Sequence, residues 1–402
     1  MKFSKLSQLF LACGVGLIVA TLLSACALVT IDYVFVAGTS SSSGAVEVFA
    51  ADSQSGALRA VAGSDKAPFA TGGTPTAMAA TPDNANIFVA TANPAAVVHF
   101  TVGTDGKLTQ KDKVSLTDSP VALAVGPGGA TLYVLSGATT ATLQSFALSS
   151  GAIGSVAALQ PLTIPGFTGD LVQPTSIAVL ANGSAVYATL VDTSAYNPGG
   201  SVTSSANPGW IFGFATGSKG ALTAVGGSPW RAGVKPSASV AEPTNRFIYV
   251  TDFASNQMIG YSIMSSNVLN FLISGPYKTG SQPSAVAIDP RGRYLYVSNS
   301  LDSSVTAFAI DIATGIPSQA LNTTGSQTNA TDTQPMGITV DPALGRFVYT
   351  ANFLGNSISG FRLNTNTGAL TLTQATPYPS LSKSTAILAV PHGNHSVQVV
   401  PQ

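Results

Sequence analysis

Charged side chains are scarce in this sequence. Only 8% of the 402 residues are Asp, Glu, Lys or Arg, whereas an average soluble domain has roughly 25%. The 17 basic and 17 acidic residues also cancel. Because neutralising phosphate groups requires clustered Lys and Arg, neither nucleic acid nor an anionic membrane surface is expected as a partner.

Cysteine is almost absent as well. The two cysteines, Cys13 and Cys26, both lie near the N-terminus. Lys2 and Lys5 precede an apolar stretch over residues 9–23, which is typical of a secretory signal peptide. Since Cys13 would leave with that peptide, the mature chain lacks a pair of thiols. Disulfides, cysteine metal sites and a cysteine nucleophile are therefore not expected.

The four residues 23–26, "LSAC", resemble the bacterial lipoprotein signal, in which the cysteine becomes the lipid-modified first residue. The resemblance implies a signal peptide over 1–25, lipidation at Cys26 and a short tether over 26–32. The protein would then be exported and bound to a membrane through its lipid anchor, and Ala27 favours the outer membrane or cell surface. The alternative is an uncleaved anchor, because residues 9–31 are long enough to cross a bilayer.

Long runs without glycine or proline are rare, because the chain has 40 Gly and 24 Pro. This pattern predicts many short strands joined by turns, and no helices beyond the N-terminal segment. A proline before a short apolar run recurs every 45 to 62 residues, at Pro75, Pro120, Pro174, Pro236, Pro283 and Pro335. Lys383-Ser384 takes this place in a last copy. A period of this size, with four apolar runs in each unit, indicates the blades of a propeller.

A second type of apolar run appears seven times, at 33–38, 87–92, 132–135, 186–190, 247–252, 294–299 and 347–352. We therefore predict an all-β fold over residues 33–402: a seven-bladed β-propeller of four-stranded antiparallel blades. The first unit lacks its own opening strand, so residues 385–390 are expected to join the N-terminal blade as its innermost strand and hide the open edges. In an alternative closure, residues 397–400 take the second position in that blade.

The stretch "QPSAVAIDPRGRYLYVSN" (282–299), followed by a Ser-rich loop, a "VTAFAI" strand and a "TG" turn, resembles the YVTN-type repeats of the seven-bladed β-propeller lactonase family. The resemblance covers residues 33–402. It implies the propeller fold, and the namesake activity of the family is hydrolysis of 6-phosphogluconolactone. The repeated motif consists of residues that build blades, so it is specific for the fold and not for the activity.

Loops before the first strands and after the second strands of the blades should open on one face, the top face. This arrangement places at the channel mouth Asp118, Gln173, Lys235, Gln282, Gln334 and Lys383. An outer ring follows at the ends of the second strands, with Asn93, Asp192, Asp252, Asn299 and Asn352. These side chains either cap the strand ends by hydrogen bonds to backbone amides or bind a neutral polyol as a ring.

Two other features of the top face stand out. The loop over 190–210 is much longer than its counterparts, and loops above about 12 to 15 residues are often functional, so it is a candidate lid. Proline-aromatic pairs, among them Pro229-Trp230, precede several first strands. Such rings serve carbohydrate binding in many proteins, whereas their recurrence favours a packing role. Trp230, with Arg231 beside it, is the candidate ligand-binding member.

Catalytic motifs are missing. The sequence has three His and two Glu, and no HExxH, Walker or GxSxG motif. The candidate bases are Asp118, Asp192 and Asp252. No cofactor or metal is expected; a calcium site, which needs about six to eight oxygen ligands, would have to use these three carboxylates. A phosphate site is also poorly supported, because the arginines at 246, 291, 293 and 346 fall in turns on the opposite face.

Two functions remain open. The first is a surface-tethered binding module for a small neutral ligand, a glycan or another protein, without catalysis. The second is a lactone hydrolase, in which a top-face Asp or His activates water while Arg231, Lys235 or Lys383 stabilises the oxyanion.

The lipid anchor is directly testable. Replacing Cys26→Ser should abolish both lipid labelling and processing of the chain, because the thiol is the acylation site and a stable anchor needs more than one acyl chain. Mass spectrometry of the wild-type N-terminus is the measurement. An unmodified N-terminus, cleaved or full-length, would contradict the prediction.

Overall fold

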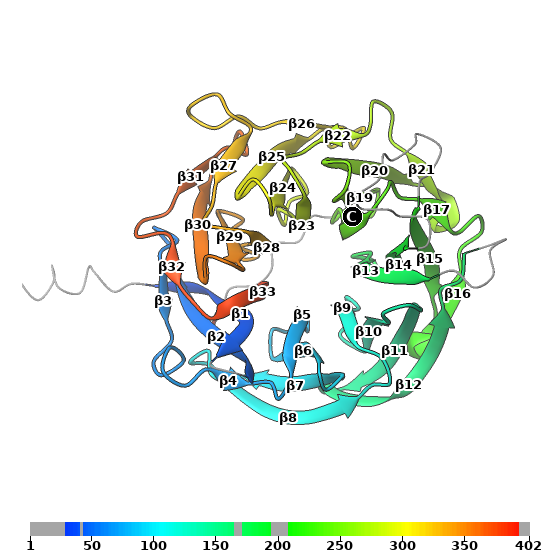
Figure 1. Cartoon of the computed structure of the whole chain (residues 1–402), viewed down its shortest axis with the longest axis horizontal. Helices are drawn as coiled ribbons and strands as arrows, with labels where there is room; N and C mark the ends of the chain where they lie inside the picture. The colour runs from blue at the N-terminus through cyan, green and yellow to red at the C-terminus, as the bar shows by residue number, and fades with distance from the viewer. Residues whose placement is uncertain (1–28, 41–42, 165–170, 194–207, 394–402) are drawn as a thin grey trace, which may run out of the picture.

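The fold was obtained as a computed structural model that describes residues 29–40, 43–164, 171–193 and 208–393. Seven antiparallel sheets surround a central opening (Figure 1). They are called blades A to G in chain order. Within the described ranges the only helical elements are two 3-10 turns, η1 (Ser218–Gly220) and η2 (Ser265–Asn267), and none has the length and apolar character needed to cross a membrane.

The four strands of each blade pair in sequence from the channel outward. The innermost strands of blades A to G are β33 (Ser382–Pro391), β5 (Thr74–Ala80), β9 (Pro120–Val125), β13 (Val172–Val179), β18 (Pro236–Ala241), β23 (Pro283–Ile288) and β28 (Pro335–Val340). The second strands are β1 (Thr30–Ser40), β6 (Asn86–Ala92), β10 (Thr131–Ser136), β14 (Ala185–Asp192), β19 (Phe247–Asp252), β24 (Tyr294–Asn299) and β29 (Phe347–Asn352).

The outer strands complete the blades. The third strands are β2 (Ser43–Asp52), β7 (Ala96–Val102), β11 (Thr142–Ser149), β15 (Gly209–Thr216), β20 (Gln257–Ile263), β25 (Ser304–Ile310) and β30 (Ser357–Leu363). The fourth strands are β3 (Leu58–Ala60), β8 (Leu108–Ser115), β12 (Ala152–Pro161), β16 (Leu222–Ala224), β21 (Leu269–Phe271), β26 (Pro317–Gln319) and β31 (Leu370–Leu372). The predicted seven-bladed, four-stranded propeller is confirmed.

Five blades carry a further short strand that the sequence analysis did not predict. These strands pair with the third strand of their own blade and are β4 (Phe69–Ala70), β17 (Trp230–Arg231), β22 (Tyr277–Lys278), β27 (Thr328–Ala330) and β32 (Tyr378–Pro379). Four of them contain the aromatic residue of a proline-aromatic pair. Tyr277 and Tyr378 are buried, so these aromatic rings contribute to the packing of the blades.

Blade A is closed by strands from both ends of the chain. β33 pairs antiparallel with β1, with Val34 opposite Ala389 and Val36 opposite Ile387. β1 in turn pairs with β2. The predicted innermost position of residues 385–390 is therefore confirmed, and residues 397–400 lie outside the described part of the chain. The ring has no open edge at this seam, and edges of that kind otherwise invite pairing with other chains.

The second strands form the core between the blades, and their tyrosines join one blade to the next. Tyr249, Tyr296 and Tyr349 are fully buried. Each hydroxyl donates to a glycine carbonyl in the turn between the third and fourth strands of the following blade, on Gly315, Gly368 and Gly56 respectively, at 2.7 to 2.9 Å. This contact explains why tyrosine and the turn glycine recur in the repeat.

The turn glycine itself is required by its surroundings. Gly315 has φ of 73°, and a Cβ at this position would overlap the ring of Phe247 in the preceding blade. Any other residue would be strained in this left-handed conformation and would also clash. The "TG" turn of the repeat is therefore a packing element between blades.

A second set of hydrogen bonds runs around the channel. The recurring proline near the start of each first strand, or Ser384 in blade A, is called the anchor residue. The hydroxyl group of the residue after it donates to the carbonyl of the next blade's anchor proline: Thr385 to Pro75, Thr76 to Pro120, Ser237 to Pro283 and Ser284 to Pro335. Their lengths are 2.6 to 3.1 Å. The Pro-Ser/Thr step of the repeat thus links neighbouring innermost strands.

A buried acid lies at the closure seam. Asp32 of β1 sits opposite Pro391 of β33 and is fully buried, next to the carboxyl group of Asp341. Burial is the main cause that raises the pKa of Asp32 well above its ordinary value, and the negative charge of Asp341 raises it further. The native state therefore holds this proton more tightly than the unfolded chain does.

The pH dependence of this site gives a prediction. The stabilising effect of a protonated Asp32 is fully present below the ordinary carboxyl pKa and is lost as pH rises through the raised pKa. Asp32→Asn removes the penalty, so we expect its melting temperature to exceed that of the wild type by roughly 2 °C or more at pH 7. The gap should narrow toward pH ~4. Asp118→Asn, at an exposed site, is the control; equal pH profiles for wild type and Asp32→Asn would contradict the prediction.

Candidate functional site

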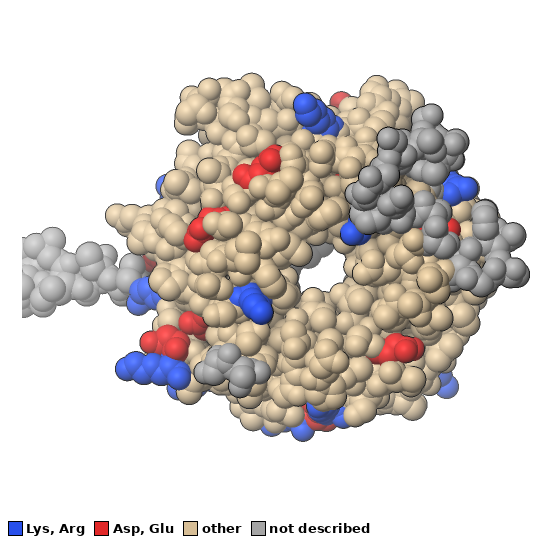
Figure 2. Space-filling model, viewed as in Figure 1, with Lys and Arg blue, Asp and Glu red and all other residues tan. Residues whose placement is uncertain are grey.

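The candidate site lies on the top face, where the second strands end and the chain enters the first strands. Figure 2 views the molecule along the channel: the charged side chains are scattered over this face, and uncharged ones surround most of the opening. In the described part of the chain, no group of three or more His, Cys, Asp or Glu is arranged to hold a metal ion.

The residues before the anchor positions are held through their backbone. Gln282, Gln334 and Lys383 have φ of 54°, 58° and 51°. Their N–H groups donate to Asn256, Ser303 and Asn356, respectively, which lie in top-face loops of the preceding blade. The loop of one blade thus fixes the start of the next first strand.

Fixing the backbone leaves the amide side chains available. Gln282 and Gln334 are half-buried, and their side chains make no hydrogen bond to other described residues. Gln173 is exposed near the start of β13, opposite Val191. Each of these three amides offers both hydrogen-bond donors and an acceptor.

Two of the three asparagines of the predicted outer ring face into their own blades, whereas Asn93 is exposed. Asn299 and Asn352 are both fully buried. The side-chain amide of Asn299 donates to the hydroxyls of Ser304 and Thr306, at 3.0 and 2.9 Å. Asn352 makes the equivalent bonds to Ser357 and Ser359, both at 3.0 Å. Both residues therefore tie the end of the second strand to the third strand.

Asp252 is bound to the loop that leads into its own blade. It is fully buried and accepts the N–H groups of Val234 and Lys235, both at 2.9 Å. The side chain of Gln257 donates to the same carboxylate at 3.2 Å. Both carboxylate oxygens are thus engaged in holding the 233–235 loop.

The other two candidate bases lie in different blades. Asp192 is buried at the end of β14, where it pairs with Val172 at the start of β13. Asp118 is exposed in the loop between β8 and β9. The three aspartates therefore lie apart along the ring, before blade C, in blade D and in blade E.

The structure brings four of the predicted residues together where blades D and E meet. The guanidinium carbon of Arg231 lies 3.7 Å from the ring centroid of Trp210, and the Lys235 ammonium lies 4.8 Å from that of Phe253. Both are cation–π contacts. Trp230 is half-buried and pairs with Ile211, and Asp252 holds the connecting loop. This cluster is called the D/E junction.

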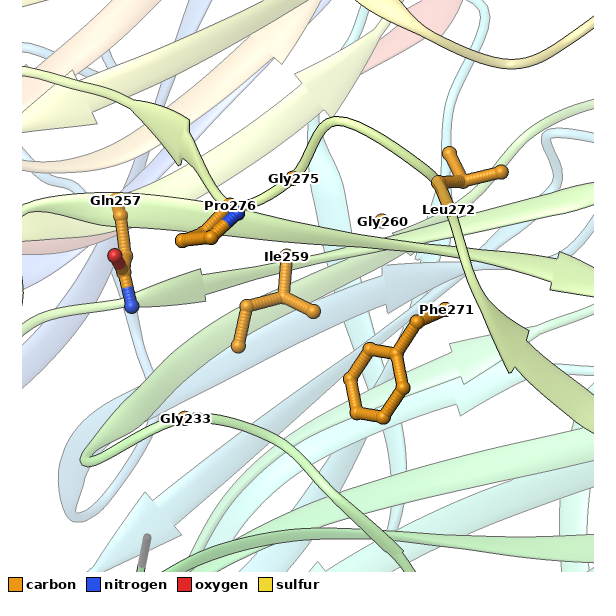
Figure 3. A pocket seen from close by; sticks show the side chains of 8 residues that line it. All are labelled: Gly233, Gln257, Ile259, Gly260, Phe271, Leu272, Gly275 and Pro276. Carbon is orange, nitrogen blue, oxygen red and sulfur yellow. The ribbon is translucent and has the colours of Figure 1, made fainter. Parts of the chain in front are cut away.

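A cavity of about 230 Å³ opens beside this junction. Gly233 lies on one side of it, and Gln257, Ile259 and Phe271 of blade E lie on the other (Figure 3). Phe271 is 58% exposed. The sequence analysis missed these residues, although an aromatic residue in a short outer strand was a visible signal. Two predicted features, Cys26 and most of the 190–210 loop, lie outside the described residues.

The role of Asp252 can be tested by its stability effect. In Asp252→Ala the N–H groups of Val234 and Lys235 lose their acceptor, so we expect a loss of about 1–3 kcal/mol in the free energy of unfolding. Denaturant titration is the measurement, and Asp118→Ala, at an exposed position, should change stability by less than about 0.5 kcal/mol. Equal stability of the two variants would contradict the structural role of Asp252.

The fold and the sequence can be compared with known proteins. The periplasmic gluconolactonase of Pseudomonas aeruginosa superposes with a TM-score of 0.73 and 18% identity, over 90% of this chain and 99% of that one. A Lactobacillus plantarum protein gives 0.69 and 14%, covering 90% and 100%. A functionally unknown protein from Desulfotomaculum acetoxidans gives 0.65 and 13%, with the same coverage. At these identities the likeness concerns the fold alone.

No curated protein matches the sequence. Residues 32–166 and 231–381, however, match the family described as lactonase, 7-bladed beta-propeller. The matched ranges cover most of the chain, from the first strand of the closure seam to the loop before the last strand. The protein therefore belongs to the lactonase family of seven-bladed β-propellers.

Proposed function

We propose that the protein is a binding module, which holds a neutral, hydroxyl-rich ligand such as a glycan, or another protein, at its top face without hydrolysing it. The main observation behind this proposal is that Asp252 has a structural role: both of its carboxylate oxygens accept backbone N–H groups. A general base must instead reach the proton that it removes. The amides of Gln173, Gln282 and Gln334 suit hydrogen bonding to hydroxyl groups.

The D/E junction is the proposed centre of binding. Aromatic rings with hydrogen-bonding groups beside them suit the apolar faces and hydroxyl groups of sugars. The Arg231 and Lys235 cations contact the rings of Trp210 and Phe253, and Gly233 of the connecting loop lines a cavity. Asn299 and Asn352 act in this proposal by fixing the loops and not by direct contact.

Lactone hydrolysis is the second candidate function. It is favoured by membership of the lactonase family, and one similar structure is a periplasmic gluconolactonase. In this alternative Asp118, Asp192 or Asp252 activates water, and Arg231, Lys235 or Lys383 stabilises the oxyanion. It needs neither a metal nor another cofactor; calcium would have to be held by the three aspartates.

The proposed location is outside the cytoplasm. The sequence of residues 1–26 supports export and lipidation at Cys26, and a structurally similar protein is periplasmic. In this proposal residues 26–32 tether the propeller to the membrane, with the outer membrane or cell surface favoured. A cytosolic sugar phosphate would seldom reach such a protein, which favours a neutral ligand.

An assay of lactone hydrolysis separates the two functions. We expect purified mature protein not to accelerate hydrolysis of δ-gluconolactone or 6-phosphogluconolactone above the buffer rate, with or without calcium. A positioned base and an oxyanion donor would each raise the rate of hydrolysis by a factor of roughly 10² or more, so enzymatic turnover would clearly exceed the buffer rate. Turnover that is lost in Asp118→Asn, Asp192→Asn or Asp252→Asn would overturn the binding proposal and establish the lactonase alternative.

A further inference from the structure

Among the five blades that have the short extra strand, one position of the third strand carries a different side chain in each. The position is found from the pairing with the short extra strand. In blade A, Val46 pairs with Phe69, and in blade E, Met258 pairs with Tyr277; the position in question is the residue directly after Val46 or Met258. The next residue in each case is Glu47 in blade A, Phe212 in D, Ile259 in E, Thr306 in F and Ser359 in G. Among these five described blades, blade A alone has an ionisable group at this position.

The hydroxyl groups at this position have a structural partner. Thr306 accepts the N–H of Gly280 at 3.1 Å, and Ser359 accepts that of Asp332 at 2.9 Å. Both donors lie three residues before an anchor proline. Glu47 has the equivalent partner, because it accepts the N–H of Leu381 and also the hydroxyl of Ser380, at 3.0 Å. A threonine or serine would satisfy the backbone donor, so the carboxylate brings a charge that the fold does not need.

The charge faces a cavity of about 330 Å³ between β2 and the chain that leads from β32 to β33. These strands lie together at one side of the ring (Figure 1). Phe49, Pro68 and Pro379 supply apolar walls, and Asp65 and Lys66 lie at the exposed rim. Glu47 itself is only 6% exposed. The corresponding cavity of blade E, described above, has Ile259 in place of this carboxylate (Figure 3).

We propose that the blade A cavity is a binding site for a small organic cation, an ammonium group on a short hydrocarbon body. Glu47 would pair with the ammonium group, and Phe49 and the two prolines would enclose the hydrocarbon. Two carboxylates, Glu47 and Asp65, face the cavity, whereas Lys66 is the one cation among its described lining residues and lies at the rim. An ammonium ligand would therefore balance a charge that is otherwise buried without a counter-ion.

The cavity is separate from the D/E junction, and the inference does not depend on the proposed function. It has its own pH signature. Burial first, and the charge of Asp65 in addition, raise the pKa of Glu47, while its hydrogen bonds from Ser380 and Leu381 act in the opposite direction. A cation binds the ionised form, so its affinity should rise as pH increases through the raised pKa of Glu47.

The test compares cyclohexylammonium with its neutral isostere cyclohexanol, by NMR titration of the purified protein at pH 7.5. We expect a dissociation constant on the order of 1 mM for the ammonium compound and binding weaker by about tenfold for the alcohol. Glu47→Gln, which keeps shape and hydrogen bonding, should abolish this preference. Glu47→Asp should retain it, and Thr306→Ser, which keeps the hydroxyl group at the same position of blade F, should leave it unchanged.

Equal affinity for the two compounds in the wild type, or an unchanged preference in Glu47→Gln, would overturn the proposal. Thermal melting shows whether Glu47→Gln folds. If it does not fold, the test is made with the wild type alone. Its preference for the ammonium compound must then disappear as pH is lowered toward ~4.5, while its affinity for cyclohexanol stays constant. A preference that does not change with pH would then overturn the proposal.

Discussion

The pairing of β33 with β1 is the contact on which the rest of this propeller depends. It joins residues that are 343 to 359 positions apart in the sequence, and it turns seven similar sheets into a ring without an open edge. The Tyr-to-glycine and hydroxyl-to-proline hydrogen bonds then link neighbouring blades at the A/B, B/C, E/F, F/G and G/A junctions. These links run through the seam as well: Tyr349 reaches Gly56, and Thr385 reaches Pro75.

Most of the residues that recur in the repeat serve to link the blades. The tyrosine and the turn glycine pack blade against blade, and the anchor proline and the hydroxyl after it connect the innermost strands. The Asn or Asp at the end of the second strand fixes loops. A function specific to this protein must therefore come from positions at which the blades differ. The D/E junction and the Glu47 cavity are two such places.

Much of the fold could be predicted from the sequence because the strands and turns of each repeat are visible as apolar runs separated by turn residues. The seven second strands were visible as apolar runs, and the missing opening strand of the first unit pointed to a C-terminal replacement. The five extra short strands were not predicted, because runs of two or three residues such as Phe69–Ala70 carry no periodic signal. Their pairing depends on a third strand that is already in place.

The site was harder to predict for a physical reason. Asp252 binds Val234 and Lys235, which lie 18 and 17 positions earlier in the sequence, respectively. Only the folded loop brings their N–H groups to the carboxylate. Glu47 lies in a strand that is buried along most of its length, so alternation could not show which face it occupies. The sequence placed the candidate residues around the ring, whereas the structure shows which of them are already engaged.

The size of the Glu47 cavity also depends on the closure, because Ser380 and Leu381 form its wall and lead directly into β33. Loss of β33 from blade A would open this wall and expose the edge of β1. The closed ring is therefore a precondition for the cation site and for the ordered top face around it.

Hydrogen exchange followed by mass spectrometry tests the closure most directly. If both ends of the chain build one blade, the amides of β1 and β33 must exchange only through global unfolding, with the same protection as those of β29 in the adjacent blade. Loss of protection in β33 while β29 and the other second strands remain protected would show that the C-terminal strand opens independently, and would contradict this account of the fold.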